Sequence, residues 1–380
     1  MALTVFNLPT RVIFGEGAFD RLGEEAASIG KRALIVSGQK TMRRLGLLDR
    51  SADLLERAGV QTFLFDKVEP NPRASTIDEG AALARISGVD MVIALGGGSA
   101  MDAAKGIALA AAGHKPVWHY LTTPDNPGGA IPALIMVPTV SASGSEVNSG
   151  AVITDWASHQ KRVLSRPSLQ PVAAIVDPEL TLSLPLQPTL AGGIDIFCHA
   201  LEPYITANHP EPLNDGWREA MMRTVVESLP QVREDLRNLK ARRALAWAST
   251  MACSAFSSLG GGDGWMTLHG IEHPLSGLYD IAHGDGLAAL LPAWLADVLR
   301  ERSDRVRLLG ERVFGTGDGQ KAVEDWLRSV GMRLRLENLG VKPESIPELA
   351  RLAKVSSPWI KHNPTPLEAD DIERLYRMAY

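Results

Sequence analysis

Short apolar runs alternate with amphipathic segments along the first half of the chain. Segments such as 45–58 and 76–86 carry apolar residues three and four positions apart, which predicts helices that pack one face against a core. Between such segments, continuous apolar runs predict strands at Arg11–Phe14, Arg32–Val36, Gln61–Phe65, Asp90–Leu95, Ala133–Val137 and Ala173–Val176. This alternation is typical of a parallel, Rossmann-like α/β sheet with helices on both faces.

The pattern changes near Pro185. From Thr189 onward the chain has almost no strand-like run, and helical periodicity recurs over residues 219–229, 240–259, 287–301, 320–330 and 368–379. The stretch LSLPLQP at 182–188 suits a hinge, because proline interrupts regular structure. A chain of 380 residues is also too long for a single hydrophobic core. We therefore predict an α/β domain over residues 1–185 and an all-helical domain over residues 186–380.

Composition narrows the classes of partner. Hydrophobic residues make up 45% and charged residues 22%, and the net charge of −5 gives no reason to expect nucleic acid or an anionic membrane as partner. The N-terminal residues lack the features of a signal peptide. Two uncharged stretches, 126–145 and 244–262, are interpreted as a loop with a strand and as an internal helix, not as membrane spans. The sequence has two cysteines, Cys198 and Cys253, whereas a secreted protein of this size would often carry a disulfide framework, so we expect a reducing, cytoplasmic location.

Two glycine-containing loops each follow a predicted strand. The first, Gly96-Gly97-Gly98-Ser99, leads into a helix, where free N–H groups and the helix dipole favour phosphate. Ser99 could cap that helix or donate its hydroxyl to the phosphate. The second loop, PTVSASGSE at 138–146, places hydroxyls at the end of another strand. Each alone could be an ordinary turn or polar loop, but together they favour a nucleotide site.

Histidines and one carboxylate gather in two segments of the predicted helical domain. His199 follows Asp195 by four positions, so a helix places both on one face, and His269 and His273 share that spacing. His283 lies in the same segment as the latter pair. One carboxylate with imidazoles suits Fe(II), Zn(II) or a similar divalent ion. Spacing does not say which histidine stays outside the coordination shell.

At this point the motifs, in order along the chain, resemble those of the iron-containing (group III) alcohol dehydrogenases. They are PTRVIFGEGA, EPNP, GGGSAMDAAK, PTVSASGSE, AVITD, DPELTLSLP, GGIDIFCHALEPY, HGIEHPLSGLYDIAHG and NPTP, and they extend from Pro9 to Pro366. The segment around His269 and His283 is most similar to the butanol-dehydrogenase branch. The motif PTVSASGSE differs from the family's common PTTAGTGSE. Ser143 replaces the threonine before the last glycine and keeps its hydroxyl.

The resemblance implies a role for each matching residue. The metal ligands fall on Asp195, His199, His269 and His283, and His273 falls on a non-ligating histidine near the substrate and nicotinamide. The implied cofactor-binding residues are Gly38, Gln39, Lys40, Asn71, Gly97, Gly98, Ser99, Asp102, Thr139, Ser143, Ser145 and Leu180. We expect His273 to act as the catalytic proton relay, since imidazole titrates near neutral pH.

The residues after the second predicted strand bear on the choice of cofactor. NAD-using relatives commonly carry an acidic residue there, whereas this chain has Gly38, Gln39 and Lys40, followed by Arg43 and Arg44. The absence of a carboxylate and the nearby cations favour NADP(H) over NAD(H). The alternative is that these cations only solvate the start of a helix.

The sequence therefore predicts a metal-dependent alcohol dehydrogenase or aldehyde reductase, with Fe(2+) as the metal and Zn(2+) as a possible replacement. It would act on a small primary alcohol or aldehyde, as a homodimer or larger homo-oligomer. One alternative is a dehydroquinate-synthase-like lyase, and another is a metal-free enzyme of the maleylacetate-reductase type. A nucleotide-binding sensor without catalysis is a third. The substrate and the choice between iron and zinc stay open.

Overall fold

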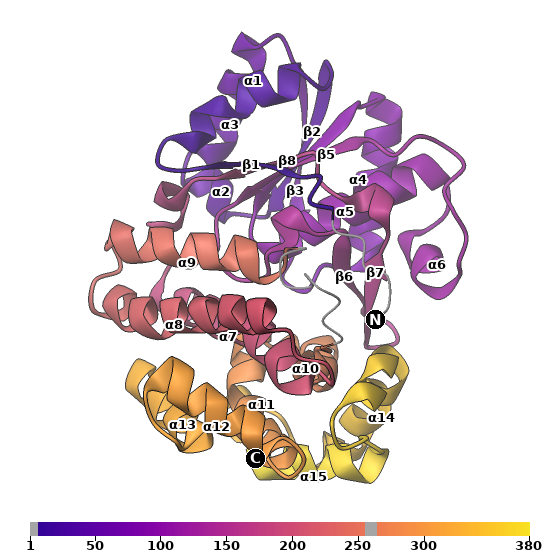
Figure 1. Ribbon diagram of the computed structural model, residues 1–380. Helices are drawn as coiled ribbons and strands as arrows, with labels where there is room; N and C mark the ends of the chain where they lie inside the picture. Colours follow the sequence, from indigo (N-terminus) through magenta and orange to yellow (C-terminus); the bar gives the residue numbers. More distant parts are fainter. Residues whose placement is uncertain (1–6, 255–263) are drawn as a thin grey trace.

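The computed structural model describes residues 7–254 and 264–380. An α/β unit and a helical unit lie one above the other, and the chain passes from the first to the second once its last sheet strand is complete (Figure 1). This architecture confirms the predicted class, a parallel Rossmann-like domain followed by an all-helical domain. The placing of the boundary at residue 185 stays a prediction.

A parallel sheet of six strands forms the centre of the first unit, in the order β1-β8-β5-β4-β2-β3. The strands span Arg11–Phe14 (β1), Arg32–Gly38 (β2), Gln61–Val68 (β3), Met91–Gly96 (β4), Ala133–Pro138 (β5) and Ala173–Val176 (β8). All six were predicted, and β3 extends three residues beyond the predicted end at Phe65. Every residue of β4 is buried, which explains why its sequence is a continuous apolar run rather than an alternating one.

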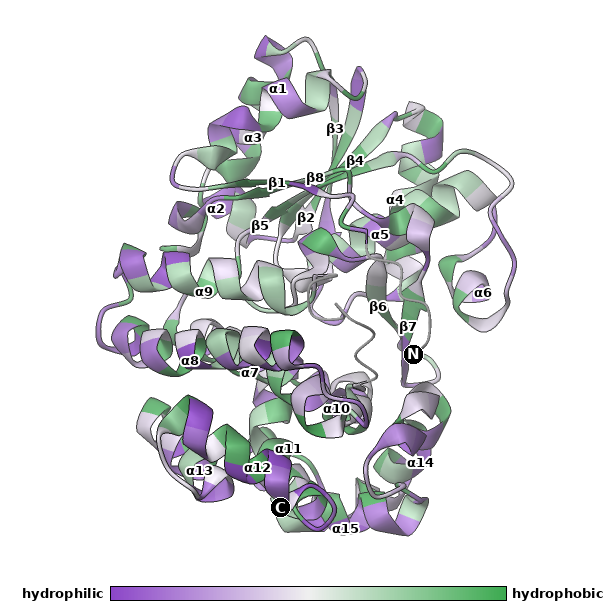
Figure 2. Ribbon diagram, viewed as in Figure 1, coloured by the Kyte–Doolittle hydropathy of each residue, from purple (hydrophilic) through white to green (hydrophobic). Residues whose placement is uncertain are grey.

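Alternate residues of the strands enter two separate hydrophobic cores. Leu34, Val36 and Val92 pack on one face beneath α4 and α5, whereas Ile35 and Ile93 pack on the other beneath α1 and α3. Figure 2 shows the sheet as a largely hydrophobic band between helices that are polar on their outer sides. The helices of this unit are α1 (Leu22–Ala27), α2 (Thr41–Arg44), α3 (Leu47–Arg57), α4 (Ala74–Ser87), α5 (Gly98–Gly113) and α6 (Val117–Thr122). The helix predicted over 45–58 begins at Leu47, because Gly46 adopts a left-handed conformation with φ 69°.

An antiparallel hairpin, β6 (Gly150–Asp155) and β7 (Gln160–Ser165), was not predicted as strands. In β7 the buried residues Lys161 and Leu164 are separated by partly or fully exposed ones, so the sequence shows no continuous apolar run. The hairpin extends from the sheet toward the helical unit, where Gly277 of α10 lies close to the His159 carbonyl.

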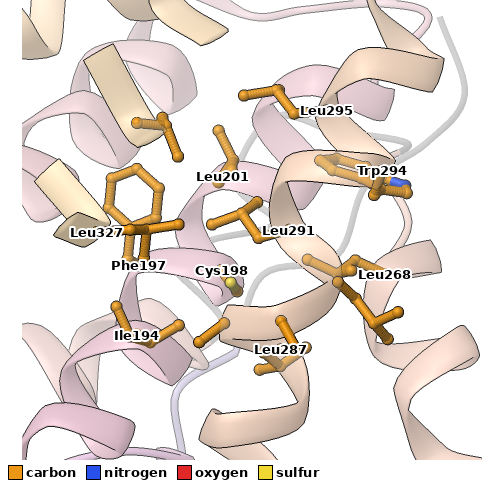
Figure 3. Close-up of a cluster of buried hydrophobic side chains, with 14 of the residues drawn as sticks. Ile194, Phe197, Cys198, Leu201, Leu268, Leu287, Leu291, Trp294, Leu295 and Leu327 are labelled. Atoms are coloured by element: carbon orange, nitrogen blue, oxygen red, sulfur yellow. The ribbon is translucent and has the colours of Figure 1, made fainter. Parts of the chain in front are cut away.

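The helical unit packs around one hydrophobic core, in which α7 and α11 contribute neighbouring rows of side chains (Figure 3). Ile194, Phe197 and Leu201 of α7 face Leu287 and Leu291 of α11 across this core. The helices are α7 (Leu186–Thr206), α8 (Pro212–Glu234), α9 (Leu239–Ala252), α10 (Thr267–Tyr279), α11 (His283–Val298), α12 (Ser303–Leu309), α13 (Gly319–Val330), α14 (Ile346–Ser356) and α15 (Ala369–Ala379).

Two sequence predictions touch residues that the structure does not describe. The helix predicted over 240–259 ends at Ala252, and its positions 255–259 lie outside the described residues. Positions 255–262 of the 244–262 stretch lie outside them too. The 126–145 stretch contains β5 with loops on both sides, as predicted. Within the described part of the chain, no helix combines the length and the apolar character needed to cross a membrane.

Candidate active site

A cavity of about 1240 Å³ separates the two units, and residues from both of them line it. Its upper wall is formed by the carboxyl ends of β2, β4 and β5, and its lower wall by α7, α10 and the start of α11. Most of the predicted site residues line this cavity: Gly38, Gln39, Lys40, Asn71, Gly97, Gly98, Ser99, Asp102, Thr139, Ser143, Ser145, Asp195, His199, His269, His273 and His283. Ligands of open α/β sheets bind at this edge, so the cavity is the candidate active site.

The glycine loop turns directly from β4 into α5. Gly97 is the residue before the helix and Gly98 its first residue, so the free N–H groups of a 16-residue helix face the cavity. A Cβ on Gly98 would lie 2.7 Å from the Ser143 hydroxyl, so a larger residue there would have to displace the Ser143 side chain. No side chain caps α5, so Ser99 does not act as the helix cap.

Buried charges join α5 to the second loop. Asp102 accepts hydrogen bonds from the Ser145 hydroxyl at 2.7 Å and from the Val152 N–H at 2.8 Å. Lys105, one helical turn further on, donates to the carbonyls of Ser145 at 2.7 Å and Gly150 at 2.6 Å. Burial lowers the pKa of Lys105 to about 8, partly opposed by Asp102. The sequence did not single out Lys105, although a lysine within an alanine-rich helix is a signal of a buried, hydrogen-bonded cation.

Two residues near the expected cofactor end are not part of the cavity lining. Leu180, which the resemblance placed near the nicotinamide, is buried in the core beneath the sheet and is not among the described residues that line the cavity. Arg43 does not face the cavity either, because its guanidinium binds the Asp66 carboxylate with Nε–Oδ2 at 3.2 Å. Of the cations near the end of β2, Lys40 is the one that contributes to the cavity wall among the described residues.

The histidines and the carboxylate meet around one oxygen atom. Oδ1 of Asp195 lies 3.6 Å from Nδ1 of His199, 3.3 Å from Nε2 of His269 and 3.8 Å from Nε2 of His283. Asp195 and His199 come from one face of α7, and the other two residues from α10 and the first residue of α11. Asp195, His199 and His269 are buried and could share one metal ion, while the His283 side chain is 25% exposed.

This donor set fits a divalent metal ion. Asp195 Oδ1, His199 Nδ1 and His269 Nε2 are buried and have no hydrogen-bond partner among the described residues, so each has an unsatisfied lone pair or proton. Donors that bind a tetrahedral ion at about 2.1 Å lie roughly 3.4 Å apart, close to the observed separations. Burial lowers the pKa of His199 to about 3, against the opposing effect of Asp195, so that imidazole is neutral and able to ligate.

Two buried glutamates, which the sequence analysis missed, bind the ring nitrogens of two histidines on the side away from Asp195. Glu202 accepts from Nδ1 of His269, and Glu272 accepts from Nδ1 of His283. Both glutamates are fully buried. Such outer carboxylates fix the ring tautomer and direct the other nitrogen at the metal. Their signal was present, because Glu202 and Glu272 are charged residues within otherwise apolar helical segments.

His273 lies beside the cluster, next to the rings of His283 and Trp359. Its ring centroid is 5.9 Å from that of His283 and 5.7 Å from that of Trp359, which packs edge-on against it. Burial lowers the pKa of His273 well below its ordinary value, and the nearby Lys161 adds to this effect. The imidazole is therefore neutral, and its buried Nδ1 has no partner among the described residues. Lys161 and Trp359 also line the cavity and were not predicted from the sequence.

Comparison with known proteins places this geometry in a family. The family model "Iron-containing alcohol dehydrogenase" matches residues 9–178, and "Fe-containing alcohol dehydrogenase family, C-terminal" matches residues 189–380. The chain belongs to the iron-containing alcohol dehydrogenase family, in its butanol-dehydrogenase-like branch. It is an NAD(P)-dependent oxidoreductase of the alcohol dehydrogenase class, and the lyase alternative is not favoured.

Individual relatives support this assignment over most of the chain. The chain is 37% identical over 317 residues to the "Probable NADH-dependent butanol dehydrogenase 1" of Bacillus subtilis, covering 83% of this chain and 81% of the relative. It is 31% identical to the NADPH-dependent aldehyde reductase YqhD of Escherichia coli, covering 91% and 92%. The crystal structure of NADH-dependent butanol dehydrogenase A from Thermotoga maritima superposes with a TM-score of 0.94 at 30% identity, covering 100% of this chain and 99% of that one.

Proposed function

We propose that the protein interconverts a primary alcohol and its aldehyde with NADP(H), using Fe(2+) held by Asp195, His199, His269 and His283. Zn(2+) is the alternative occupant of the same ligands. In the oxidative direction the alcohol loses a hydride to NADP⁺ and its hydroxyl proton to solvent, giving the aldehyde and NADPH. The observation that carries the proposal is the convergence of three histidine nitrogens on Asp195 Oδ1, at the wall of a cavity that also contains the glycine loop.

The ligand residues have distinct tasks in this proposal. When bound, a divalent ion supplies a Lewis acid that lowers the pKa of an alcohol oxygen. Asp195 supplies the negative charge, and the histidines supply neutral donors whose orientation the buried Glu202 and Glu272 maintain. His283 is the most exposed of the four side chains and lies at the side of the cluster from which substrate can approach.

His273 is proposed to handle the hydroxyl proton. The buried Nδ1 of its neutral imidazole has no partner among the described residues, and the ring lines the cavity beside His283. Because burial holds the pKa of His273 well below its ordinary value, a proton that the ring accepts from the reacting oxygen is not retained and passes on toward solvent. The edge-on contact with Trp359, whose indole N–H donates to the Met266 carbonyl at 2.9 Å, keeps the ring in place.

NADP(H) is proposed as the preferred cofactor. Gly38, Gln39 and Lys40 line the cavity at the carboxyl end of β2, and none of them can repel a 2′-phosphate. Lys40 could bind that phosphate, whereas Arg43 is occupied by Asp66. Relatives bear names of both kinds, NADH-dependent butanol dehydrogenases and an NADPH-dependent aldehyde reductase, so family membership alone does not decide the preference.

The proposal extends to the substrate class, the oligomeric state and the location of the protein. Small aliphatic primary alcohols and aldehydes, of the length of butanol, are the first substrates to test, in keeping with the names of the relatives. A cytoplasmic homodimer is proposed, with the edge strand β1 as its interface. Light scattering of the purified protein would test the dimer.

Two histidine variants test the central proposal. His269→Ala should lose bound metal and alcohol oxidation together, because it removes a buried ligand. His273→Ala should keep its metal and lose rate, because it removes only the proton acceptor. The measurements are metal content and butanol oxidation with NADP⁺ and NAD⁺ as separate acceptors. A His269→Ala protein that contains no metal and keeps full activity would refute the proposal.

A further inference from the structure

Asn71 makes an unusual set of contacts across the cavity. It lies in the loop after β3 and adopts a left-handed conformation with φ 51°. Its Nδ2 donates to Asp280 Oδ1 at 2.9 Å and to the Ile281 carbonyl at 3.3 Å, while its Oδ1 accepts from Lys161 Nζ at 2.9 Å. The Asn71 side chain, which is 7% exposed, thus binds the α/β unit to the segment that leads into His283.

Asp280 is the other half of this contact. It directly follows the last residue of α10 and has a left-handed conformation, with φ 56°. It lies three positions before His283, where α11 begins. Its second oxygen, Oδ2, accepts from Arg73 Nη2 at 3.0 Å. The Arg73–Asp280 pair is partly exposed and contributes little alone, so the partly buried bond from Asn71 to Asp280 and its buried bond to the Ile281 carbonyl carry most of the contact. Two non-glycine residues in left-handed conformations, joined to each other, indicate a constraint that the surrounding fold maintains.

The contact continues toward the His283 ring. The Ser276 hydroxyl lies 3.1 Å from the Ile281 carbonyl and 2.6 Å from Oε1 of Glu272. Glu272 in turn accepts from His283 Nδ1. On the opposite side the backbone is packed against α7, since a Cβ on Gly284 would lie 2.1 Å from the Ala191 carbonyl oxygen. The position of His283 is therefore determined jointly by α7 and by the α/β unit.

We propose that Asn71, Arg73 and Asp280 form an interdomain latch that positions His283, and that through this latch dinucleotide binding and metal retention stabilise each other. The inference rests on the proposed function. Asn71 and Lys161 line the cavity, so a bound dinucleotide would restrain the same side chains that restrain residues 280–283. If the dinucleotide raises the affinity for the metal, the metal must raise the affinity for the dinucleotide by the same factor.

The decisive variant is Asp280→Gly. Glycine accepts the left-handed conformation readily, so the substitution removes both side-chain bonds without straining the backbone. His114→Gly is the matched control, because His114 is also a left-handed residue that ends a helix, with φ 58°, but is exposed and outside the cavity lining. Arg73→Gln is a second test variant, which removes one bond of the latch and leaves the Asn71 bonds in place.

The experiment measures release of Zn²⁺ from the loaded protein into excess chelator, with and without saturating NADPH, together with the thermal midpoint of each variant. In the wild type and in His114→Gly, NADPH should slow release about tenfold, within the usual range of such couplings. Asp280→Gly should release metal about tenfold faster than wild type, and NADPH should barely slow it. Arg73→Gln should change in the same direction by less.

The outcomes separate the latch from the proposed function. If Asp280→Gly releases metal at the wild-type rate, or if NADPH slows its release by the wild-type factor, the latch is refuted while the metal site stands. If NADPH leaves the wild-type rate unchanged, the coupling is refuted. A wild-type protein that retains no metal would overturn the proposed function itself, and this is seen before any variant is compared.

Discussion

Glu202 accepts a hydrogen bond from Nδ1 of His269 and, with the same carboxylate, from the backbone N–H groups of Leu268 at 2.6 Å and His269 at 3.2 Å. This one side chain of α7 thereby determines both the start of α10 and the orientation of the His269 ring. Burial alone lowers the pKa of His269, but Glu202 and Asp195 more than offset this and raise it to about 10. The carboxylates thus require a positive charge between them, which a bound divalent ion can provide.

Replacing Glu202 by glutamine should weaken metal binding. The amide keeps the size of the side chain but loses the charge that holds the imidazole, so we expect Zn²⁺ affinity to fall about tenfold to a hundredfold. Competition with a chromophoric chelator measures the affinity. Glu219→Gln is the control, because Glu219 is also a buried helical glutamate but binds Tyr204 and Arg312 away from the cavity. Equal affinities in wild type and Glu202→Gln would contradict the proposed support of His269.

The ligands should differ in importance. Asp195→Ala removes the oxygen on which the three histidines converge and should abolish metal binding at micromolar concentrations. His283→Ala leaves the buried group Asp195, His199 and His269, so it should retain metal with reduced affinity. Metal content after desalting distinguishes the two variants. Complete loss of metal from both would show that His283 is as essential as the buried ligands.

Lys40 should set the preference for NADP(H). Lys40→Ala should lower kcat/KM for NADPH about tenfold or more, because it removes the cation available for the 2′-phosphate, and should leave that for NADH nearly unchanged. Arg43→Ala is the matched control. Its guanidinium is bound to Asp66, so its loss should alter the ratio of the two values little. A wild-type enzyme that prefers NADH would show that the cations only solvate the helix start.

Lys105 should make stability depend on pH in the alkaline range. Its ordinary pKa of 10.5 is lowered to about 8 by burial, so between these values the unfolded chain binds the additional proton. The free energy of unfolding therefore rises with pH through this window, by up to about 3 kcal/mol. Relative to Lys105→Met, the wild type should gain stability from pH 7.5 to pH 10 in urea unfolding. A difference between the two proteins that does not change with pH would contradict the shift.

The predicted strands were found because their signal is local. β4 is buried on both faces and ends in glycines, so its continuous apolar run and the turn after it can both be recognised from adjacent residues. The β6–β7 hairpin was missed for the opposite reason. Lys161 is a residue type that is usually exposed, but here it is buried and donates to Asn71, 90 residues away in the chain, with carboxylates of other elements nearby.

The candidate site, too, could be predicted only in part from the sequence. The spacing of Asp195 and His199 predicted a shared helix face, which α7 provides, but separating the ligands from His273 depended on the family resemblance. Glu202, Glu272 and Asp280 act through partners on other helices or on the other unit. No periodicity connects such pairs, since their contact depends on how the elements pack.

By itself the sequence determined the alternation of strands and helices, the change to an all-helical second half and the family, because these follow from local periodicity and ordered motifs. Only the tertiary structure decided that three histidines surround one oxygen of Asp195, that Arg43 binds Asp66 while Lys40 lines the cavity, and that Leu180 lies in the core. These are contacts between distant segments. Their geometry arises when the two units pack together, which no local pattern of residues encodes.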